Sequence, residues 1–307
     1  MMLKIGIIGV GDIAQKAYLP VLCRDGLELH LFTRNQQKLK QVAKQYRIVN
    51  LHSSIHSIVE SGIKGAFVHT STDSHETIIE QLLLKNIHVY VDKPITYDYH
   101  SSKRLVDLAK SKGLHLMVGF NRRYAPAYRT LRDVPNPNMI IIQKNRYSLP
   151  GEVRTFVFDD FIHVLDTLRF LFNKQEIEIL VRGMKKDGLL FHVVVQMIAD
   201  DGSTAIGIMN RDAGVLEENV EVFSSIEKKS VNNLTQLKIT KNKTELIALG
   251  NDWESTLYKR GFENIVAEFI KLVDTNAPPE FSMEDALSTH QLCEEVVRRL
   301  SRESEVS

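Results

Sequence analysis

The chain has 307 residues, of which 43% are hydrophobic and 25% are charged, and its formal net charge is +1. This length predicts about two domains, and the balance of 39 basic and 38 acidic residues lacks the basic surplus of nucleic-acid-binding proteins. Only Cys23 and Cys293 are present, which favours a reducing compartment over a disulfide framework. No secretory signal is expected, and the sequence has no apolar run of the ~20 residues that a membrane helix needs. We therefore expect a cytoplasmic protein without nucleic-acid or membrane partners.

Short β-rich runs alternate with helical patterns over residues 1–120. Strands that recur after helices imply right-handed crossovers, so this part is predicted to be an α/β Rossmann domain, a doubly wound parallel sheet. Helices are predicted at 36–45, 77–84 and 101–112. The six predicted strands are 3–8, 27–32, 47–50, 65–69, 88–91 and 114–118.

The pattern changes at residue 121, after which strands follow one another with few helices between them. Residues 121–307 are predicted to form an α+β domain with an open, mostly antiparallel sheet. Its strands are predicted at 139–147, 177–182, 191–199, 203–209, 217–224 and 235–240. Its helices are predicted at 160–172, 262–273 and 283–300.

A glycine-rich turn follows the first predicted strand, with Gly-Val-Gly-Asp-Ile-Ala at residues 9–14. Gly9 permits the tight turn, Gly11 lets the backbone approach a pyrophosphate, and the small Ala14 allows close packing of helix on strand. The N-terminus of the following helix favours an anion. A plain βα turn would also fit, but the position in a six-strand domain indicates a dinucleotide site. The predicted cofactor contacts here are Gly9, Gly11, Asp12, Ile13 and Ala14.

The end of the second strand bears on the choice between NAD and NADP. NAD sites usually carry an acid there that binds the ribose 2′-hydroxyl, whereas NADP sites replace it and add a cation. Thr33 stands near the position of the acid and Arg34 follows it. Because arginine binds phosphate with two parallel hydrogen bonds, NADP(H) is favoured over NAD(H). The alternative is that Arg34 is a solvated neighbour of adenine, which suits either cofactor.

Two further places carry candidate chemistry. Lys93 follows the fifth strand, at the sheet edge where α/β proteins bind ligands, although most lysines at strand ends are only solvated. Asp159 and His163 are four residues apart on a predicted helix, with Asp166 near the same face. An acid one turn before a histidine orients the imidazole as a general base. The alternative is a helix-capping Asp159 beside a partly buried His163.

Other polar residues form weaker patterns. Lys144 and Arg146 lie on one face of a predicted strand, where they would meet an anionic or polyol substrate or simply face solvent. Packing is the expected role of Trp253, the only tryptophan, with stacking on the substrate as the alternative. Metal binding by Asp159 and His163 is a weaker alternative, because no third ligand is nearby in sequence, so no metal site is predicted.

Five motifs follow one another along the chain. They are the turn at 9–14, Thr-Ser-Thr-Asp-Ser-His at 70–75, Asp-Lys-Pro at 92–94, Gly-Phe-Asn-Arg-Arg-Tyr at 119–124 and Asp-x-x-x-His at 159–163. In this order the set resembles the Gfo/Idh/MocA family of nicotinamide-dependent oxidoreductases. Within that family the chain is most similar to the branch called virulence factor MviM homologues, over nearly its whole length.

This resemblance implies a role for each matching position. Lys93 would contact the substrate hydroxyl and the nicotinamide ribose, His163 would be the catalytic histidine, and Asp159 would be the acid that precedes it. The second domain would bind substrate on one side of its sheet and a partner subunit on the other, as a homodimer or homotetramer. Apart from the resemblance, the spacing on the predicted strand and helix makes Lys144, Arg146 and Asp166 candidate substrate contacts. The remaining cofactor contacts would be Thr70, Thr72, His75, Asp92, Lys93 and Asn121.

Three departures from the family pattern limit the transfer. Asp92 replaces the usual glutamate before the lysine, Ser71 replaces a proline and is expected to loosen the cofactor-side loop, and Phe161 stands where many members carry glycine. A phenylalanine there is expected to narrow the pocket, so the substrate need not be the free monosaccharide or cyclitol of many relatives.

The sequence as a whole predicts an NAD(P)-dependent oxidoreductase that acts on a secondary alcohol or ketone of a sugar-like or cyclitol-like small molecule. In the oxidation direction, His163 would remove the hydroxyl proton, Asp159 would hold the imidazole, and Lys93 would polarise the same oxygen. Two alternatives remain. One is a regulator that senses NAD(P) without turnover, and the other is an NAD-assisted glycosidase, which the same fold hosts.

Overall fold

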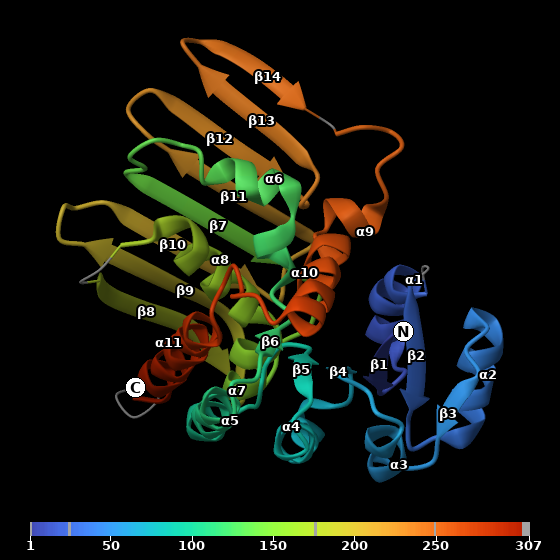
Figure 1. Cartoon of the computed structure of the whole chain (residues 1–307). Helices are drawn as coiled ribbons and strands as arrows, with labels where there is room; N and C mark the ends of the chain where they lie inside the picture. The colour runs from blue at the N-terminus through green and yellow to red at the C-terminus, as the bar shows by residue number, and fades with distance from the viewer. Residues whose placement is uncertain (1, 24–25, 175–176, 249, 303–307) are drawn as a thin grey trace. The chain divides into compact units, whose positions relative to one another are not determined.

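The computed structural model describes residues 2–23, 26–174, 177–248 and 250–302. The chain divides into two compact units, Met1–Gly119 with Phe262–Ser288 and Phe120–Gly261 with Thr289–Ser307. Each unit is built on a β-sheet (Figure 1).

The first unit contains a sheet of six parallel strands in the order β3-β2-β1-β4-β5-β6, which confirms the predicted Rossmann architecture. The order reverses between β1 and β4, and open α/β sheets bind ligands at such a switch point. The third strand begins later than predicted, because Arg47 adopts a left-handed conformation with φ 57° and ends the preceding helix. The strands are β1 (Leu3–Ile8), β2 (Leu27–Phe32), β3 (Asn50–His52), β4 (Gly65–Val68), β5 (His88–Val91) and β6 (Leu116–Val118).

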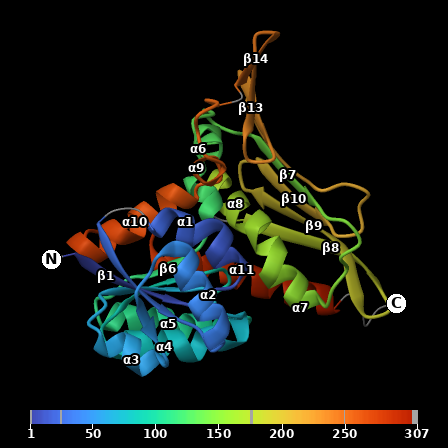
Figure 2. The same ribbon diagram turned by 90° about the vertical axis from the view of Figure 1, so that its right-hand side faces the viewer.

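Helices cover both faces of this sheet (Figure 2). One of them, α10 (Phe262–Thr275), comes from the C-terminal part of the chain. Its Phe269 ring lies 4.9 Å from the Phe67 ring and 5.6 Å from the Tyr90 ring, and this aromatic packing groups α10 with the first unit. The others are η1 (Ala14–Tyr18), α1 (Leu19–Leu22), α2 (Gln36–Tyr46), α3 (Ile55–Glu60), η2 (Thr72–Ser74), α4 (His75–Leu84) and α5 (Tyr99–Ser111).

The second unit contains a sheet of eight strands in the order β14-β13-β12-β11-β7-β10-β9-β8. Its neighbouring strands are antiparallel except for β7 and β10, which run parallel, so the predicted mostly antiparallel α+β fold is confirmed. The strands are β7 (Met139–Asn145), β8 (Ile177–Lys186), β9 (Leu189–Ala199), β10 (Thr204–Asn210), β11 (Glu217–Phe223), β12 (Glu227–Asn232), β13 (Gln236–Lys241) and β14 (Thr244–Ala248).

A long helical segment packs on β7 and β10 and differs from the prediction at its start. It begins at Val153 rather than 160, because the Glu152 carboxylate accepts a hydrogen bond from Thr155 N and caps it. It runs through α7 (Val153–Phe156), a π-helical turn η4 (Val157–Phe161) and α8 (Ile162–Phe172). A Cβ at Gly207 of β10 would lie 2.7 Å from Leu168 Cδ1 and 2.9 Å from Val164 Cγ1, so glycine lets this helix approach the sheet.

The remaining helices of the second unit are short, except for the last one. They are η3 (Asn121–Tyr124), α6 (Pro126–Leu131), α9 (Thr256–Lys259) and α11 (Met283–Arg302), of which the part from Thr289 onward belongs to this unit.

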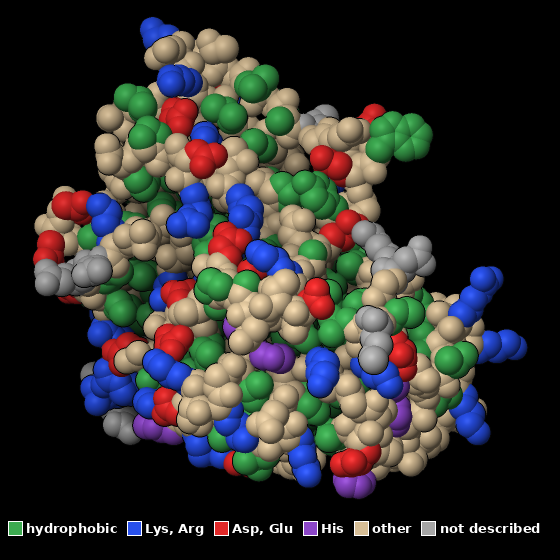
Figure 3. Space-filling model, in the orientation of Figure 1, with side chains coloured by type: hydrophobic (Ala, Val, Ile, Leu, Met, Phe, Trp, Pro, Cys, Tyr) green, Lys and Arg blue, Asp and Glu red, His purple; other side chains and the backbone are tan. Residues whose placement is uncertain are grey.

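Basic and acidic side chains are interspersed over the face drawn in Figure 3, in line with the near-neutral net charge. Within the described residues, no helix has the length and apolar character needed to cross a membrane.

Candidate functional site

The glycine turn after β1 has the geometry that a dinucleotide needs. Gly9 has φ +90°, and a Cβ there would lie 2.7 Å from the His69 carbonyl oxygen, so the turn itself requires glycine. A Cβ at Gly11 would meet only that oxygen at 3.8 Å, so the chain leaves the space beside Gly11 open. A pyrophosphate can therefore approach the backbone there, next to the switch point between β1 and β4. Asp12 and Ile13 are exposed, and Ala14 is buried.

The end of β2 presents a basic side chain. Thr33 is half-buried and Arg34 is exposed. The side chain of the next residue, Asn35, is already engaged: it accepts a hydrogen bond from Lys38 N at 2.9 Å and caps α2. Within the described residues, no side-chain hydrogen bond or ion pair uses the Arg34 guanidinium, which leaves it able to contact a phosphate or an adenine ring.

A buried histidine links the two loops that follow β4 and β5. His75 Nδ1 lies 3.0 Å from the Pro94 carbonyl oxygen, and its Nε2 lies 3.2 Å from the Thr70 carbonyl oxygen. Burial lowers the pKa of His75, while both carbonyls oppose that change. His75 thereby fixes the loop that carries Thr70 and Thr72 against the loop that carries Lys93.

The lysine loop is also held by its neighbouring acid. The Asp92 carboxylate accepts a hydrogen bond from Lys93 N at 2.9 Å, and burial raises the pKa of Asp92. Asp92, although shorter than the glutamate usual in the resembled family, therefore holds the backbone of the half-buried Lys93 at the carboxyl edge of the sheet.

A buried cluster behind the glycine turn was not predicted. The Tyr18 and Tyr90 hydroxyl oxygens are 2.8 Å apart, and the His69 ring lies 4.0 Å from the Tyr18 ring. Within the described residues, neither ring nitrogen of the buried His69 has a hydrogen-bond partner. Burial lowers the pKa of His69 to about 3, so the ring is neutral.

In the second unit, the helix on β7 and β10 carries both Asp159 and His163. Asp159 lies in the π-helical turn, His163 lies in the first turn of α8, and both are half-buried. Such turns occur often at functional sites because they displace side chains from the regular helical positions. Asp159 and His163 therefore lie on one helical segment, four residues apart, with the π-helical turn at the acid.

The next residue, Asp160, holds two cations, the buried Lys144 and the half-buried Arg146. Its carboxylate accepts hydrogen bonds from Lys144 Nζ at 2.5 Å and from Arg146 Nε and Nη2 at 3.0 Å each. Burial opposes ionisation of Asp160, but Lys144 and Arg146 together hold its pKa well below the usual range. Burial, with Arg122 nearby, lowers the pKa of Lys144 to about 8. Sequence reasoning missed Asp160, because its importance depends on strand β7.

A second buried ion pair stands beside this group. Arg122 donates to Glu218 through Nε at 2.7 Å and through Nη2 at 2.6 Å, and the Tyr128 hydroxyl donates to the same carboxylate at 2.8 Å. Burial opposes ionisation of Glu218, but Arg122 lowers its pKa to about 2. Both groups are therefore charged and fixed in place.

Asp166 and Asn121 have their polar groups engaged by the protein. Asp166 is 1% exposed; its carboxylate accepts from Arg123 Nε at 2.9 Å, from Arg123 Nη2 at 2.5 Å and from Thr289 Oγ1 at 3.0 Å. The amide nitrogen of buried Asn121 donates to the Arg260 carbonyl at 2.9 Å.

Two other expectations meet a different outcome. Trp253 is 94% exposed, so the packing role expected for it is wrong. Phe161, expected to narrow a pocket, is 0% exposed and therefore has no solvent-facing surface.

Comparison with known proteins agrees with the fold and the motifs. Residues 3–120 match the model of the oxidoreductase family with an NAD-binding Rossmann fold, GFO_IDH_MocA, and residues 126–242 match the YceM-like C-terminal domain. The putative oxidoreductase YceM of Salmonella typhimurium is 32% identical over 304 residues, which cover 96% of this chain and 97% of that protein. The chain belongs to the Gfo/Idh/MocA family of oxidoreductases.

Solved structures of this family superpose on nearly the whole chain. A Gfo/Idh/MocA oxidoreductase from Vibrio cholerae has a TM-score of 0.92 at 31% identity, covering 99% of both chains. The dehydrogenase MviM from Clostridium difficile has a TM-score of 0.92 at 32% identity, covering 97% of this chain and 99% of that one. The resemblance to the MviM branch is therefore confirmed, and this Gfo/Idh/MocA protein is an oxidoreductase with an NAD(P)-binding Rossmann domain.

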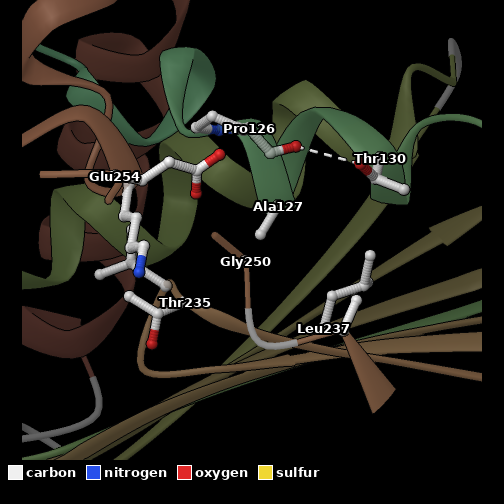
Figure 4. Close-up of a pocket in the computed structure, with 10 residues that line it drawn as sticks. Pro126, Ala127, Thr130, Thr235, Leu237, Gly250 and Glu254 are labelled. Atoms are coloured by element: carbon white, nitrogen blue, oxygen red, sulfur yellow. Dashed lines mark hydrogen bonds between the residues drawn. The ribbon is translucent and has the colours of Figure 1, made fainter. Parts of the chain in front are cut away.

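A separate pocket of about 180 Å³ opens in the second unit of this Gfo/Idh/MocA protein (Figure 4). Helix α6 contributes Pro126, Ala127 and Thr130, Leu237 lies across the pocket from it, and Glu254 lies beside Pro126. Of the described residues that line it, none is a predicted site residue. It is thus distinct from the groups around Asp159 and His163.

Proposed function

We propose that this oxidoreductase transfers a hydride between NADP(H) and a secondary alcohol or ketone of a sugar-like or cyclitol-like substrate. The observation that carries the proposal is that Asp159 and His163 lie four residues apart on one helical segment of the second unit and are both half-buried. A relative 21% identical over 308 residues is named myo-inositol 2-dehydrogenase, from Thermotoga maritima, which supports the polyol class of substrate.

Each residue has a defined part in the proposed chemistry. In the oxidation direction, His163 accepts the proton of the substrate hydroxyl, and Asp159 stabilises the imidazolium that forms. The Lys93 ammonium donates a hydrogen bond to the substrate oxygen. When bound, the nicotinamide ring supplies the hydride acceptor. Gly9 and Gly11 let the pyrophosphate approach the backbone, and the buried Ala14 lets the following helix pack close to the strand. Thr70, Thr72 and His75 border the cofactor, as does Asn121 through its remaining polar atoms.

The proposed preference for NADP(H) rests on the end of β2. Thr33 offers no carboxylate to a ribose 2′-hydroxyl, and the exposed Arg34 has no side-chain partner among the described residues. A titration with NADPH and NADH side by side, followed by energy transfer from protein to reduced nicotinamide, tests this. NADPH should bind at least about tenfold more tightly, since one charge-assisted contact has that magnitude. Tighter binding of NADH would contradict the preference.

Substitution of the two proposed catalytic groups tests the reaction itself. Lys93→Ala and His163→Ala should each lower kcat about 100-fold or more with a polyol or keto substrate. The exposed Lys103→Ala serves as the control. Unchanged turnover in both variants would refute the roles. Cofactor binding without any change in absorbance at 340 nm would favour a regulator, and sugar release without net change in cofactor would favour a glycosidase.

We also propose that the second sheet pairs with a second copy of the chain through the face opposite Gly207. Alternation along the strands puts Ile141, Val194, Ile206 and Ile208 on that face, and all four are only half-buried. An apolar sheet face of this kind suits a homo-oligomer. Light scattering after gel filtration should show a dimer or tetramer that Ile206→Lys disrupts; a monomeric wild type would contradict the proposal.

A further inference from the structure

The parallel pair of strands in the second unit places two arginines next to each other. Asn145 of β7 lies opposite Asn210 of β10, and Arg146 N donates to the Asn210 carbonyl at 2.8 Å. Arg146 and Arg211 therefore follow directly at the ends of neighbouring strands, which are about 5 Å apart in a sheet. Each lies two residues beyond a position of the pair Lys144 and Met209, so both side chains are on the same face of the sheet as Lys144. The Lys144 side chain on that face reaches Asp160 of the covering helix. The two arginines thus point toward the helix that carries Asp159.

The two guanidinium groups are not equally neutralised. Arg146 uses Nε and Nη2 for Asp160, which also serves Lys144. Within the described residues, the Arg211 side chain makes no hydrogen bond or ion pair, and its Nε is buried without a partner. A buried donor without a partner costs free energy in the folded protein, which is tolerated where a ligand completes the contact.

The position of Arg211 is nevertheless fixed. Its guanidinium lies 4.8 Å from the centre of the Phe156 ring, one turn before Asp160 on the same helical segment. Burial lowers the pKa of Arg211, whereas Asp160 and Asp159 attract its charge. Arg211 is therefore an oriented cation beside the proposed catalytic acid.

We propose that Arg211 and Arg146 form a subsite for an anionic group of the substrate, a carboxylate or a phosphate carried by the sugar-like or cyclitol-like molecule. This proposal rests on the proposed function and narrows its substrate class. Asp160 and Lys144 do not contact the anion; they hold Arg146 in place. A guanidinium pair can bind either anion through parallel hydrogen bonds, whereas a neutral polyol leaves the Arg211 charge uncompensated.

Calorimetric titration of the full chain without cofactor tests the subsite. The probes are D-glucose, D-glucuronate and D-glucose 6-phosphate, which share a ring and differ in the charged group. At least one anion should bind about tenfold or more tightly than glucose, and the better anion identifies carboxylate or phosphate as the preferred group. Arg211→Gln should remove that advantage without changing the affinity for glucose, and Arg211→Lys should retain part of it.

The control is Arg182→Gln on the exposed surface of β8, which should leave all three affinities unchanged. Arg146→Gln gives a second variant should Arg211→Gln unfold, and thermal unfolding of each variant checks this. The proposal is overturned if the wild type shows no preference for either anion, including no binding of any probe. It is also overturned if the folded arginine variants keep the wild-type preference.

A nicotinamide titration of the same sample separates the two proposals. Anion binding that depends on Arg211, in a chain that binds no NADPH or NADH, would keep the subsite and remove the proposed function. Turnover of neutral polyols with no advantage for their anionic derivatives would keep the proposed function and remove the subsite.

Discussion

Replacing His69 by phenylalanine should make the first unit less sensitive to mild acid. Both ring nitrogens of His69 are buried without a partner, and burial lowers its pKa to about 3. An unfolded histidine has a pKa of ~6.5, so between these two values the unfolded state binds a proton that the folded state does not. Because of His69, the free energy of unfolding therefore falls as the pH falls below ~6.5. Above that pH, His69 does not change the free energy of unfolding.

The magnitude follows from the two protonation equilibria. From pH 7.5 to pH 5, His69 should remove about 2 kcal/mol from the free energy of unfolding, because only the unfolded side chain titrates in this range. Any native pKa below ~4 gives the same figure. Phenylalanine keeps the ring that packs on Tyr18 and removes the titration.

Hydrogen exchange of the β1 and β4 amides at pH 7.5 and pH 5 measures the stability of the sheet that contains His69. The loss between the two pH values should be about 2 kcal/mol smaller in His69→Phe than in the wild type. His100→Phe, on the exposed surface of α5, should behave as the wild type. An identical loss in His69→Phe and wild type would refute the reasoning.

Three further substitutions test the described geometry. Gly9→Ala should weaken nicotinamide cofactor binding at least about tenfold and lower Tm, because the new Cβ would lie 2.7 Å from the His69 carbonyl oxygen. The control is Gly113→Ala, where φ is +63° but no atom lies within 4 Å of the new Cβ, so its effect in the same assays should be smaller. Arg123→Met should lower the free energy of unfolding in urea by ~3–5 kcal/mol, because it leaves the carboxylate of Asp166 buried without its charged partner. The exposed Arg298→Met should lower it by less than ~1 kcal/mol, and equal effects of the two substitutions would contradict this reasoning. Thr33→Asp should shift relative affinity toward NADH at least about tenfold in the fluorescence titration, since a carboxylate binds the ribose hydroxyls and repels a 2′-phosphate; an unchanged ratio would count against the proposed role of this strand end.

The parts of the fold that sequence reasoning found are those with local signals. The strands of the first sheet are short apolar runs beside glycine or polar turns, and their recurrence after helices predicted the parallel pairing that the sheet shows. Strands β12 and β14 were missed because Glu-Lys-Lys-Ser at 227–230 and Thr-Glu at 244–245 have no apolar alternation. They exist because hairpin partners pair with their backbones.

The same distinction applies to the candidate site. Gly9, Gly11, Asp159 and His163 were predicted from turn and helix spacing, which are local. Arg211 was missed because its proximity to Arg146 depends on the parallel register of β7 and β10. Asp166 carried the right spacing, but burial against Arg123 and Thr289 occupies its carboxylate, so we leave it out of the proposed substrate contacts.

The packing of α10 on the first sheet has a consequence for the order of events during synthesis. Phe269 covers Phe67 and Tyr90, yet the ribosome must first make all of residues 120–261. At ~5–20 residues per second this takes on the order of 10–30 s. Throughout that interval the nascent sheet lacks one of its covering helices, so its aromatic face is open to chaperones. A ribosome stalled before residue 262 should hold an incompletely covered sheet, and one stalled well beyond residue 288 a finished one.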